Sequence, residues 1–596
     1  MRVCARSVGL ILAAVAVLFL PWIEDGFELP KAIVLHVGSL IAVGLFLFYH
    51  EPRDGSWTKT GGLDRPVAAF LAVAAFFTAF SIHPHLSFFG QYRLYSGGLW
   101  SFFSCGLLYW VASRLPAEAA QKAVSRSLLG AGLLVLLYAA VQHAGWDPLP
   151  WREASRLSPI ATFGSPFKFA PFLALLLPVA LSAYWLSPRP ISRVFWLAFI
   201  AAALFELLAT MGRGAWLGSI VALILWVAIN WDDVKGQRAR LLRLVGLILL
   251  VLLGLWLFGP SSIRGRMAVF LNWHEGSAAN RVELWRMALR MISDAKGWGS
   301  GLETFGLVSP AFETLKFREG VGVSEIATNA HNEFLHIFVT TGLMGAAAYA
   351  WLWAGFLRLA WRRVAASASG QRVLLSGLFC GAVAHWVYAQ FNFGTTATSA
   401  YLWAFMGVLA GPKAEARSPA GGAVPSVFFR RAVLCLIGVL VLAGGYRGAL
   451  DLAADRSFKN MQFLSRRLQW LQAADAGEKA VALNPWGSYY PMSLAAAYRA
   501  LSQSCVNLAD KVHWFNEASR VFQDHLRRYP LDPDAHHNYA MSLMWRALEF
   551  KEPVIEAALE EEKKAIALAP LFPDFWNALG QMHHFAGRID EAKSAW

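Results

Sequence analysis

The sequence has few charged residues and few cysteines. Only 15% of its 596 residues are charged, whereas 57% are hydrophobic. This composition excludes a string of ordinary soluble domains and predicts a polytopic membrane protein. The five cysteines show no metal-ligand spacing, and Cys505 is the one cysteine of the C-terminal region. An internal disulfide in that region is therefore excluded.

Three further signals are missing. No small-residue cleavage site follows Leu20, so the N-terminal apolar run is expected to be a membrane span rather than a signal peptide. No Asp-x-Asp pair stands beside an apolar segment, so nothing predicts a metal-held sugar nucleotide. Paired acids inside apolar segments and an inverted repeat are also missing, which argues against a transporter.

The formal net charge of +14 suggests nucleic acid at first sight, but its distribution argues otherwise. Residues 1–450 carry 37 Lys and Arg against 21 Asp and Glu, whereas residues 451–596 carry 16 against 18. The excess lies in loops between apolar segments, where anionic lipid is the natural partner. We therefore expect a membrane-lipid partner and no nucleic acid.

Thirteen apolar runs are suited to crossing the ~30 Å hydrocarbon core of a bilayer. They lie near 7–23, 31–49, 66–82, 98–112, 127–143, 167–186, 192–210, 214–230, 241–258, 334–357, 373–391, 395–410 and 431–449. The sequence thus predicts an all-α fold of about 12–13 transmembrane helices. Residues 1–410 would form the core, 411–430 a cytoplasmic linker rich in Pro, Gly and Ala, and 431–450 an additional span.

The orientation follows from Lys and Arg in the loops. With the N-terminus in the cytoplasm, the cytoplasmic loops hold 22 such residues and the opposite short loops hold five, namely Lys31, Arg93, Arg152, Arg156 and Arg213. Cytoplasmic loops carry the excess of positive charge in membrane proteins. The long polar loop 259–333 and residues 451–596 are therefore predicted to be extracytoplasmic.

Residues 451–596 show a pattern of paired helices that is typical of a soluble tetratricopeptide-like domain. Each unit has a turn with a proline, at Pro485, Pro533 and Pro570. The last unit matches the repeat pattern best, through Trp576, Leu579, Gly580, Gly587 and Ala592. Because such units bury their faces only by stacking, the open last unit implies either a truncated chain or a docked protein partner. A generic helical domain is the alternative.

Two arginines are candidates for contacts with an anion. Arg213 stands between two spans, where a cation needs an anionic partner or must reach the interface. Arg281 falls on the apolar face of the predicted helix that begins near it. It either forms a buried pair, for example with Glu303 or Glu325, or faces an anion in a site.

His331 is the candidate base, in the segment TNAHNEFLHIF where the long loop returns to the membrane. His331 and His336 are five residues apart, so they do not share a helix face as a zinc pair would. An imidazole titrates near neutrality and can accept a proton from a hydroxyl. A purely structural histidine is the alternative.

At this point the residues match a family. The matching stretches are FELPKAIVL, FFGQYRLYSGGL, YAAVQHAGWDPLPW, ATFGSPFKFAPFLALLLP, TMGRGAWLG, RVELWRMAL with GWGSGLETF, and HNEFLHIFVTTGLMG. Over residues 10–410 the chain resembles the O-antigen ligase and polymerase superfamily of bacterial membrane glycosyltransferases. Gly212 stands where the family usually has Ser.

The resemblance implies an enzyme that moves a glycan from undecaprenyl diphosphate to an acceptor hydroxyl, without a metal or other cofactor. It implies that His331 is the general base and that Arg213 and Arg281 neutralise the diphosphate. Arg93, Arg264 and Arg266 are weaker candidates for substrate binding. The acceptor would be the lipid A core, a similar glycolipid or a protein.

Several alternatives stay open. Within the superfamily these are a repeat-unit polymerase and a protein O-oligosaccharyltransferase, which the repeats favour slightly. A transporter is a more distant alternative, and a membrane-anchored scaffold would need one span rather than thirteen. The expected location is the bacterial inner membrane, with the catalytic loop and the C-terminal region on the periplasmic side.

Overall fold

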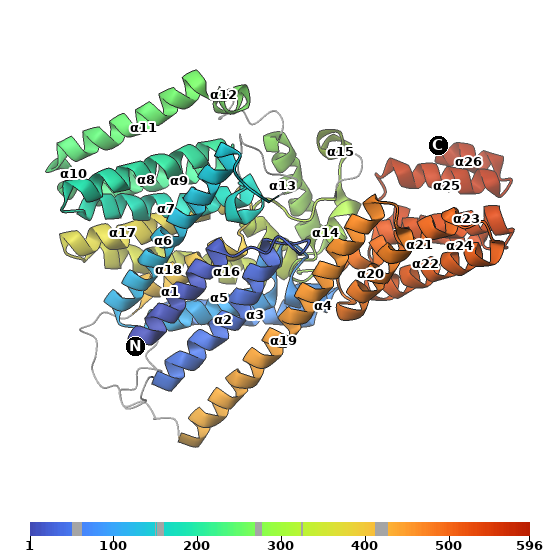
Figure 1. The fold of residues 1–596 in the computed structure, drawn as a ribbon, viewed down its shortest axis with the longest axis horizontal. Helices are drawn as coiled ribbons and strands as arrows, with labels where there is room; N and C mark the ends of the chain where they lie inside the picture. Colours follow the sequence, from blue (N-terminus) through green and yellow to red (C-terminus); the bar gives the residue numbers. More distant parts are fainter. Residues whose placement is uncertain (50–61, 150, 152–159, 269–276, 323–325, 412–426) are drawn as a thin grey trace.

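The computed structural model describes residues 1–49, 62–149, 151, 160–268, 277–322, 326–411 and 427–596. Within these ranges the regular elements are all helices, and there is no β-strand. Figure 1 shows a bundle of long helices, with the C-terminal helices α20–α26 gathered at one end of it. The predicted all-α fold is thus confirmed.

A helix lies at each of the thirteen predicted spans. They are α1 (Arg2–Val17), α2 (Glu28–Tyr49), α3 (Asp64–Ala79), α5 (Leu99–Arg114), α6 (Ala117–Ala144), α7 (Pro166–Leu186), α8 (Pro190–Ala209), α9 (Arg213–Ile229), α11 (Arg238–Phe258), α16 (Glu333–Ala365), α17 (Ser369–Ala389), α18 (Thr396–Ala410) and α19 (Val427–Arg466). Within the described ranges, eight of these helices are long and apolar enough to cross a membrane. The others have 15–17 residues.

The helix α7 is the centre of the bundle. Of its most apolar window, 89% is buried inside the protein, because α8, α9 and α17 pack around it. A helix that is apolar on all sides is expected to be enclosed in this way. The first turn of α7 therefore starts from a fixed position, at the end of the bundle where the long loop lies.

The long loop forms short helices rather than an irregular coil. They are α12 (Ser261–Ala268), α13 (Ser277–Asp294), α14 (Phe305–Val308), η4 (Ser309–Phe312) and α15 (Leu315–Val321). α13 packs against α15 and α16. Its buried side chains Leu284, Met287, Ala288 and Met291 form a small core with residues of the rest of the loop.

The glycine-rich turn 297–301 has a packing role. α16 breaks at Gly342, whose φ is 62°. The backbone N–H of Leu343 donates to the carbonyl of Gly297 at 2.9 Å, and that of Gly301 donates to the carbonyl of Thr340 at 2.8 Å. A β-carbon at Gly299 would lie 2.5 Å from the Thr340 carbonyl oxygen. Glycine is required there because the two backbones approach closely.

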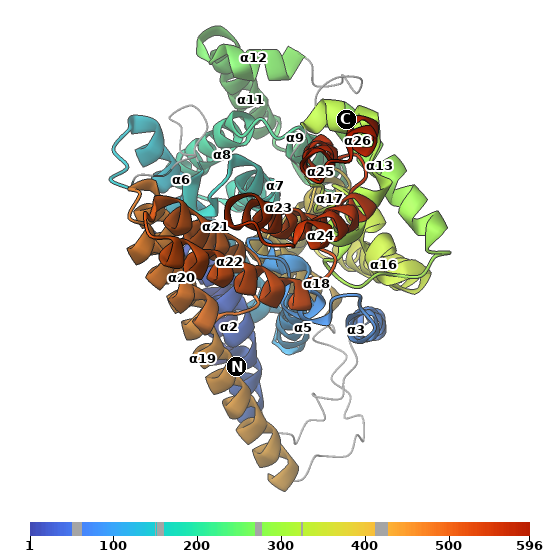
Figure 2. The same ribbon diagram turned by 90° about the vertical axis from the view of Figure 1, so that its right-hand side faces the viewer.

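The last membrane helix and the repeat region share one element. α19 has 40 residues and continues beyond the predicted span to Arg466. It is followed by α20 (Trp470–Leu483), α21 (Tyr489–Ser504), α22 (Leu508–Arg528), α23 (Pro533–Phe550), α24 (Ile555–Leu568), α25 (Pro573–Phe585) and α26 (Ile589–Ala595). These helices pack successively, as the repeat pattern predicts. Figure 2 shows them across the end of the bundle.

Candidate active site

His331 lies in the short segment that joins the long loop to α16. Its backbone is left-handed, with φ 48°, and its N–H donates to the Asn329 side-chain oxygen at 2.8 Å. Asn332 caps α16 by accepting the N–H of Leu335. Residues other than glycine rarely adopt a positive φ. The surrounding contacts therefore hold the His331 backbone in this conformation.

The partner of the His331 ring is Asn392, in the turn between α17 and α18. The distance from Nδ1 of His331 to the amide oxygen of Asn392 is 3.2 Å. Because that oxygen can only accept, Nδ1 carries the hydrogen and Nε2 keeps its lone pair. The Asn332 amide also donates to the carbonyl of Gln390, at 3.1 Å. The two turns are thereby held together.

The His331 imidazole is neutral at pH 7 because its pKa is lowered. Its pKa is lowered to about 4, mainly by burial and in addition by the positive charge of Arg281. A neutral imidazole with a free Nε2 lone pair can accept a proton. Sequence reasoning missed Asn392, although a polar residue between Phe391 and Phe393 at a membrane boundary was a usable signal.

Arg281 reaches the same place from α13. Its charge acts on both His331 and Tyr388. Four residues along the helix, the Trp285 ring lies 6.1 Å from that of Phe391. Glu303, one of the two predicted structural partners, instead lies 3.6 Å from His336. The other, Glu325, lies outside the described residues.

Arg213 is the first residue of α9. It follows Gly212, and the residue before that, Met211, has a left-handed backbone with φ 55°. A β-carbon added at Gly214 would lie 3.3 Å from Cβ of Phe391 and 3.6 Å from the Tyr388 ring. The turn that carries Arg213 is thus packed on the end of α17. The positive end of the α9 dipole lies there too, and it favours an anion.

The three residues expected to be catalytic therefore converge on one segment, 388–393. His331 contacts Asn392, Arg281 acts on Tyr388, and the Arg213 turn packs on Phe391. They come from three separate parts of the chain. A neutral base and the two helix segments that carry Arg213 and Arg281 thus meet at one place, a set of groups suited to deprotonation of a hydroxyl beside an anionic leaving group.

The weaker candidates are placed differently. Arg93 forms an ion pair with Glu24 at 3.1 Å, and its turn is tied to the 391–394 segment because Ser96 donates to the carbonyl of Gly394 at 2.9 Å. Arg264 is exposed on α12, which packs against α11. The side chain of Arg266 lies outside what the structure describes.

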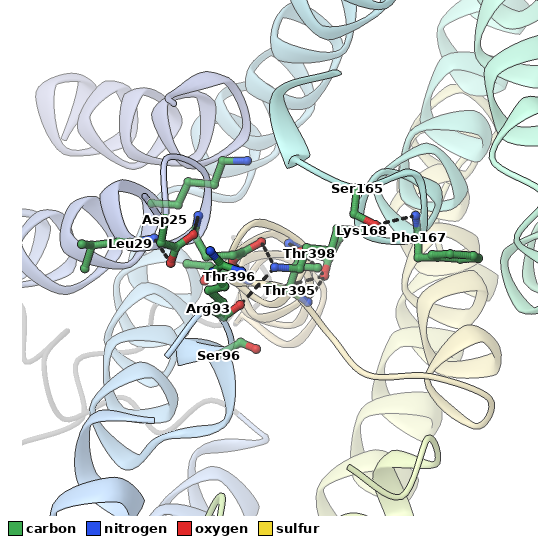
Figure 3. Close-up of polar contacts among 12 residues, drawn as sticks. Asp25, Leu29, Arg93, Ser96, Ser165, Phe167, Lys168, Thr395, Thr396 and Thr398 are labelled. Atoms are coloured by element: carbon green, nitrogen blue, oxygen red, sulfur yellow. Dashed lines mark hydrogen bonds and ion pairs between the residues drawn. The ribbon is translucent and has the colours of Figure 1, made fainter. Parts of the chain in front are cut away.

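A group of buried charges adjoins this site (Figure 3). Glu28, at the start of α2, accepts a hydrogen bond from the Thr396 hydroxyl at 2.9 Å, and Lys168 lies 3.6 Å from its other oxygen. The Lys168 ammonium also donates to the backbone oxygen of Arg93 at 3.0 Å. The first turns of α2, α7 and α18 are therefore joined through side chains.

Lys31 requires a correction. The sequence suggests a cation in a short loop, but the structure places Lys31 inside α2 with no exposed surface. Its ammonium donates to the backbone oxygen of Thr162 at 2.5 Å and lies over the Phe163 ring, 4.1 Å from the centroid. Buried ammonium groups need such partners. Arg152 and Arg156, which the sequence also suggests as cations of a short loop, lie outside the described residues.

The repeat region is attached to this end of the core through Asp455 of α19, which is fully buried. Its carboxylate accepts the backbone N–H of Asp25 at 2.7 Å and the hydroxyls of Tyr92 at 2.5 Å and Tyr490 at 3.0 Å. Four residues further on, Lys459 donates to backbone oxygens of the segment before α2. The repeats are thus not an independent appendage.

Comparison with known proteins identifies one segment that matches a family. Residues 197–350 match the family model described as O-antigen ligase. This segment belongs to the O-antigen ligase family. The matched segment contains Arg213, Arg281 and His331. The O-antigen ligase segment therefore supplies all three residues that converge on 388–393, while Asn392 lies beyond it.

Two curated relatives share the ligase description. The chain is 26% identical over 202 residues to an O-antigen ligase of Salmonella typhimurium LT2, covering 31% of this chain and 45% of that protein. It is 30% identical over 198 residues to an O-antigen ligase of Pseudomonas aeruginosa PAO1, and this match covers 33% of this chain and 44% of that protein. The chain thus spans less than half the length of these O-antigen ligases.

Among solved structures, a tetratricopeptide-repeat protein of Thermus thermophilus is similar at 20% identity. The likeness covers 28% of this chain and 80% of that one, with a TM-score of 0.21. The description of the repeat region therefore rests on its own helix pairs rather than on this likeness.

Proposed function

We propose that the protein is a glycosyltransferase of the bacterial inner membrane that transfers a glycan from undecaprenyl diphosphate to an acceptor hydroxyl. The observation that carries the proposal is the neutral imidazole of His331, held by Asn392 beside the charge of Arg281. The O-antigen ligase family of residues 197–350 supports the same chemistry.

In the proposed reaction, the acceptor hydroxyl gives its proton to Nε2 of His331 and its oxygen forms a bond to the anomeric carbon of the glycan. The bond from that carbon to the diphosphate breaks, and the diphosphate leaves with the electron pair. Attack from the opposite face inverts the anomeric configuration. Arg213 and Arg281 would neutralise the charge that develops on the leaving oxygen. We expect these two guanidinium groups to serve without a metal ion.

The sidedness is also a proposal. The distribution of Lys and Arg supports a loop 259–333 and a repeat region outside the cytoplasm. In keeping with this, α13–α15 and the repeats lie at the same end of the bundle in Figure 1. The carrier lipid would present its glycan at that face.

One observation favours a protein acceptor as the second candidate. The Arg318 guanidinium of α15 lies 3.6 Å from the centre of the Phe572 ring in the last repeat, and Ile326 packs against the core of the same repeats. Repeats seated on the catalytic loop could hold a polypeptide acceptor near it. A lipid-linked acceptor remains the first proposal.

The test is transfer by the purified protein. It is incubated with a glycan linked to undecaprenyl diphosphate and with a glycolipid or a peptide acceptor, with and without EDTA, and the products are identified by mass spectrometry. We expect a glycosylated acceptor and loss of ~10²–10⁴-fold in rate for His331→Ala, the usual cost of removing a general base. Wild-type specific activity of correctly inserted His331→Ala would refute the assignment.

A further inference from the structure

A second hollow, separate from the His331 segment, lies between the core and the extramembrane part of α19. It has a volume of about 570 Å³, which is within the range of sites for small ligands. The first turn of α7 forms part of the lining of this hollow, through Lys168. The preceding residue, Phe167, accepts a hydrogen bond from the hydroxyl of Tyr388 at 3.1 Å. The hollow thus adjoins the candidate active site across one helical turn.

The described lining of the hollow is rich in cations. Arg93 and Lys168 come from the core, and Lys459 and Arg466 come from α19, whereas the two acids are Glu24 and Asp25. Glu24 is paired with Arg93 at 3.1 Å, so the charges of these two residues offset each other.

The second acid of the described lining is Asp25. Its carboxylate accepts the backbone N–H groups of Glu28 and Leu29 at 3.2 Å each. Burial raises its pKa to about 6, so it still carries most of its negative charge at pH 7. Lys168 is paired with Glu28 at 3.6 Å. Lys459 and Arg466, the latter exposed at the end of α19, therefore stand against Asp25 alone, and this excess of positive charge in the described lining favours an anion.

Aromatic rings are also part of the described lining. Trp151 and Phe27 lie with ring centroids 4.7 Å apart, and the Trp151 indole N–H donates to the Tyr138 hydroxyl at 2.9 Å, which fixes that ring. Phe463 of α19 is 49% exposed. Ring faces carry partial negative charge and pack well against the C–H groups of a sugar ring.

From this combination we infer that the hollow is a subsite for an acidic oligosaccharide, with the carboxylates or phosphates of the sugar on the cations and its ring faces on Trp151. The inference rests on the proposed function, since it places part of a glycan substrate next to the transferred bond. It adds that α19, the helix beyond the ligase-like core, supplies binding groups of its own. The acidic sugar belongs either to the donor glycan or to the acceptor.

The first test is binding of a soluble probe to the full-length protein in nanodiscs of zwitterionic lipid. Tetragalacturonate is the acidic probe and maltotetraose is the neutral control of the same length. We expect saturable binding of tetragalacturonate that weakens with added salt, and at least about fivefold weaker binding of maltotetraose. Equal affinity for the two sugars, or no binding of tetragalacturonate, overturns the inference.

Variants locate the binding. Arg466→Glu is expected to lower the affinity for tetragalacturonate about tenfold, because one charge-assisted contact is replaced by repulsion. Arg466→Lys should keep most of the affinity for tetragalacturonate. Trp151→Ala should lower the affinity for both sugars. The matched control is Arg527→Glu, an exposed arginine of α22 outside the hollow, which should change neither. An Arg466→Glu protein that binds tetragalacturonate like the wild type places the sugar elsewhere and overturns the inference.

The transfer reaction then separates the two sources of the acidic sugar. With an acidic donor glycan and a neutral acceptor, Arg466→Glu raises the KM for the donor if the hollow holds the donor. With a neutral donor glycan and an acidic acceptor, Arg466→Glu raises the KM for the acceptor if the hollow holds the acceptor. An unchanged KM in both arms contradicts the inference. His331→Ala should bind tetragalacturonate normally, so a failure of the proposed chemistry is distinguishable from a failure of this subsite.

Discussion

The ring of His331 donates from Nδ1 to the amide oxygen of Asn392, over 3.2 Å and a separation of 61 positions in the sequence. This contact selects the tautomer whose Nε2 can act as a base. It also means that the candidate base depends on a residue of the turn between α17 and α18.

We therefore predict that Asn392→Leu lowers kcat by roughly 10–100-fold, the usual cost of losing a residue that orients a reacting group, while KM changes little. Asn392→Asp should keep the orientation and raise the pKa of His331, because a carboxylate stabilises the imidazolium. Steady-state kinetics, together with NMR titration of the histidine, measure both effects. If the leucine variant has wild-type kcat, Asn392 is not a positioning residue.

A second prediction concerns the two arginines. Arg213→Ala and Arg281→Ala should each reduce transfer by roughly 10²–10³-fold, the cost of one lost electrostatic contact in a transition state. Arg213→Lys should restore little, because an ammonium lacks the planar fork that holds two phosphate oxygens. Arg290→Ala is the control, since Arg290 is on the same helix as Arg281 but is exposed. Activity is measured per correctly inserted molecule, and a loss that only follows expression would indicate a structural role.

The third prediction is a pH dependence. The pKa of His331 is lowered to about 4, so the base is unprotonated at pH 5–7 and the acid limb of kcat should lie near 4 rather than near the usual ~6.5. Arg281→Gln removes one cause of the lowering, so its acid limb should move to higher pH. The pH profile of kcat measures this shift. If the acid limbs of Arg281→Gln and the wild type lie at the same pH, Arg281 does not act on the base.

The same shift has a consequence for stability. The unfolded chain binds a proton at His331 more readily than the folded one, so the stability from the neutral ring is complete above pH ~6.5 and is lost as the pH falls towards 4. The fall of Tm over this range should be smaller in His331→Gln than in the wild type.

The fourth prediction compares two truncations. A chain ending at 468 keeps Asp455 and Lys459, which bind the segment before α2, whereas a chain ending at 450 loses both. The shorter chain should have a clearly lower Tm, because the N–H of Asp25 and the hydroxyl of Tyr92 lose their hydrogen bonds to the Asp455 carboxylate, at ~1.5–3 kcal/mol for each hydrogen bond to a charged group. Equal Tm values would show that the Asp455 and Lys459 contacts do not stabilise the core.

The fifth prediction is topological. In a Cys505→Ala background, Lys316→Cys and Lys551→Cys should react with a membrane-impermeant maleimide added to spheroplasts, and Lys235→Cys should react only after lysis. All three positions are exposed. Labelling of position 235 alone in intact spheroplasts would invert the orientation proposed here.

The positions of the membrane helices could be predicted from the sequence, because they depend on local pattern. The partners of buried groups could not. Lys31 looks like a loop cation until its acceptor, the Thr162 carbonyl, is known. Asp455 looks like an ordinary surface acid, yet it binds Asp25 across 430 positions. Hydrophobic periodicity records which side of a helix is buried and not what lies opposite it.

The continuity of α19 restricts how this chain can vary in length. Each residue inserted into a helix rotates everything beyond it by ~100° and moves it by ~1.5 Å. One residue added between Tyr446 and Asp455 would therefore turn the Asp455 carboxylate away from the core and carry the repeats around the helix axis. Seven added residues, close to two full turns, would restore the direction but lift the repeats by ~10 Å. The helix thus sets both the angular phase and the height of the repeats, and insertions should be tolerated in the segments flanking α19 but not within it.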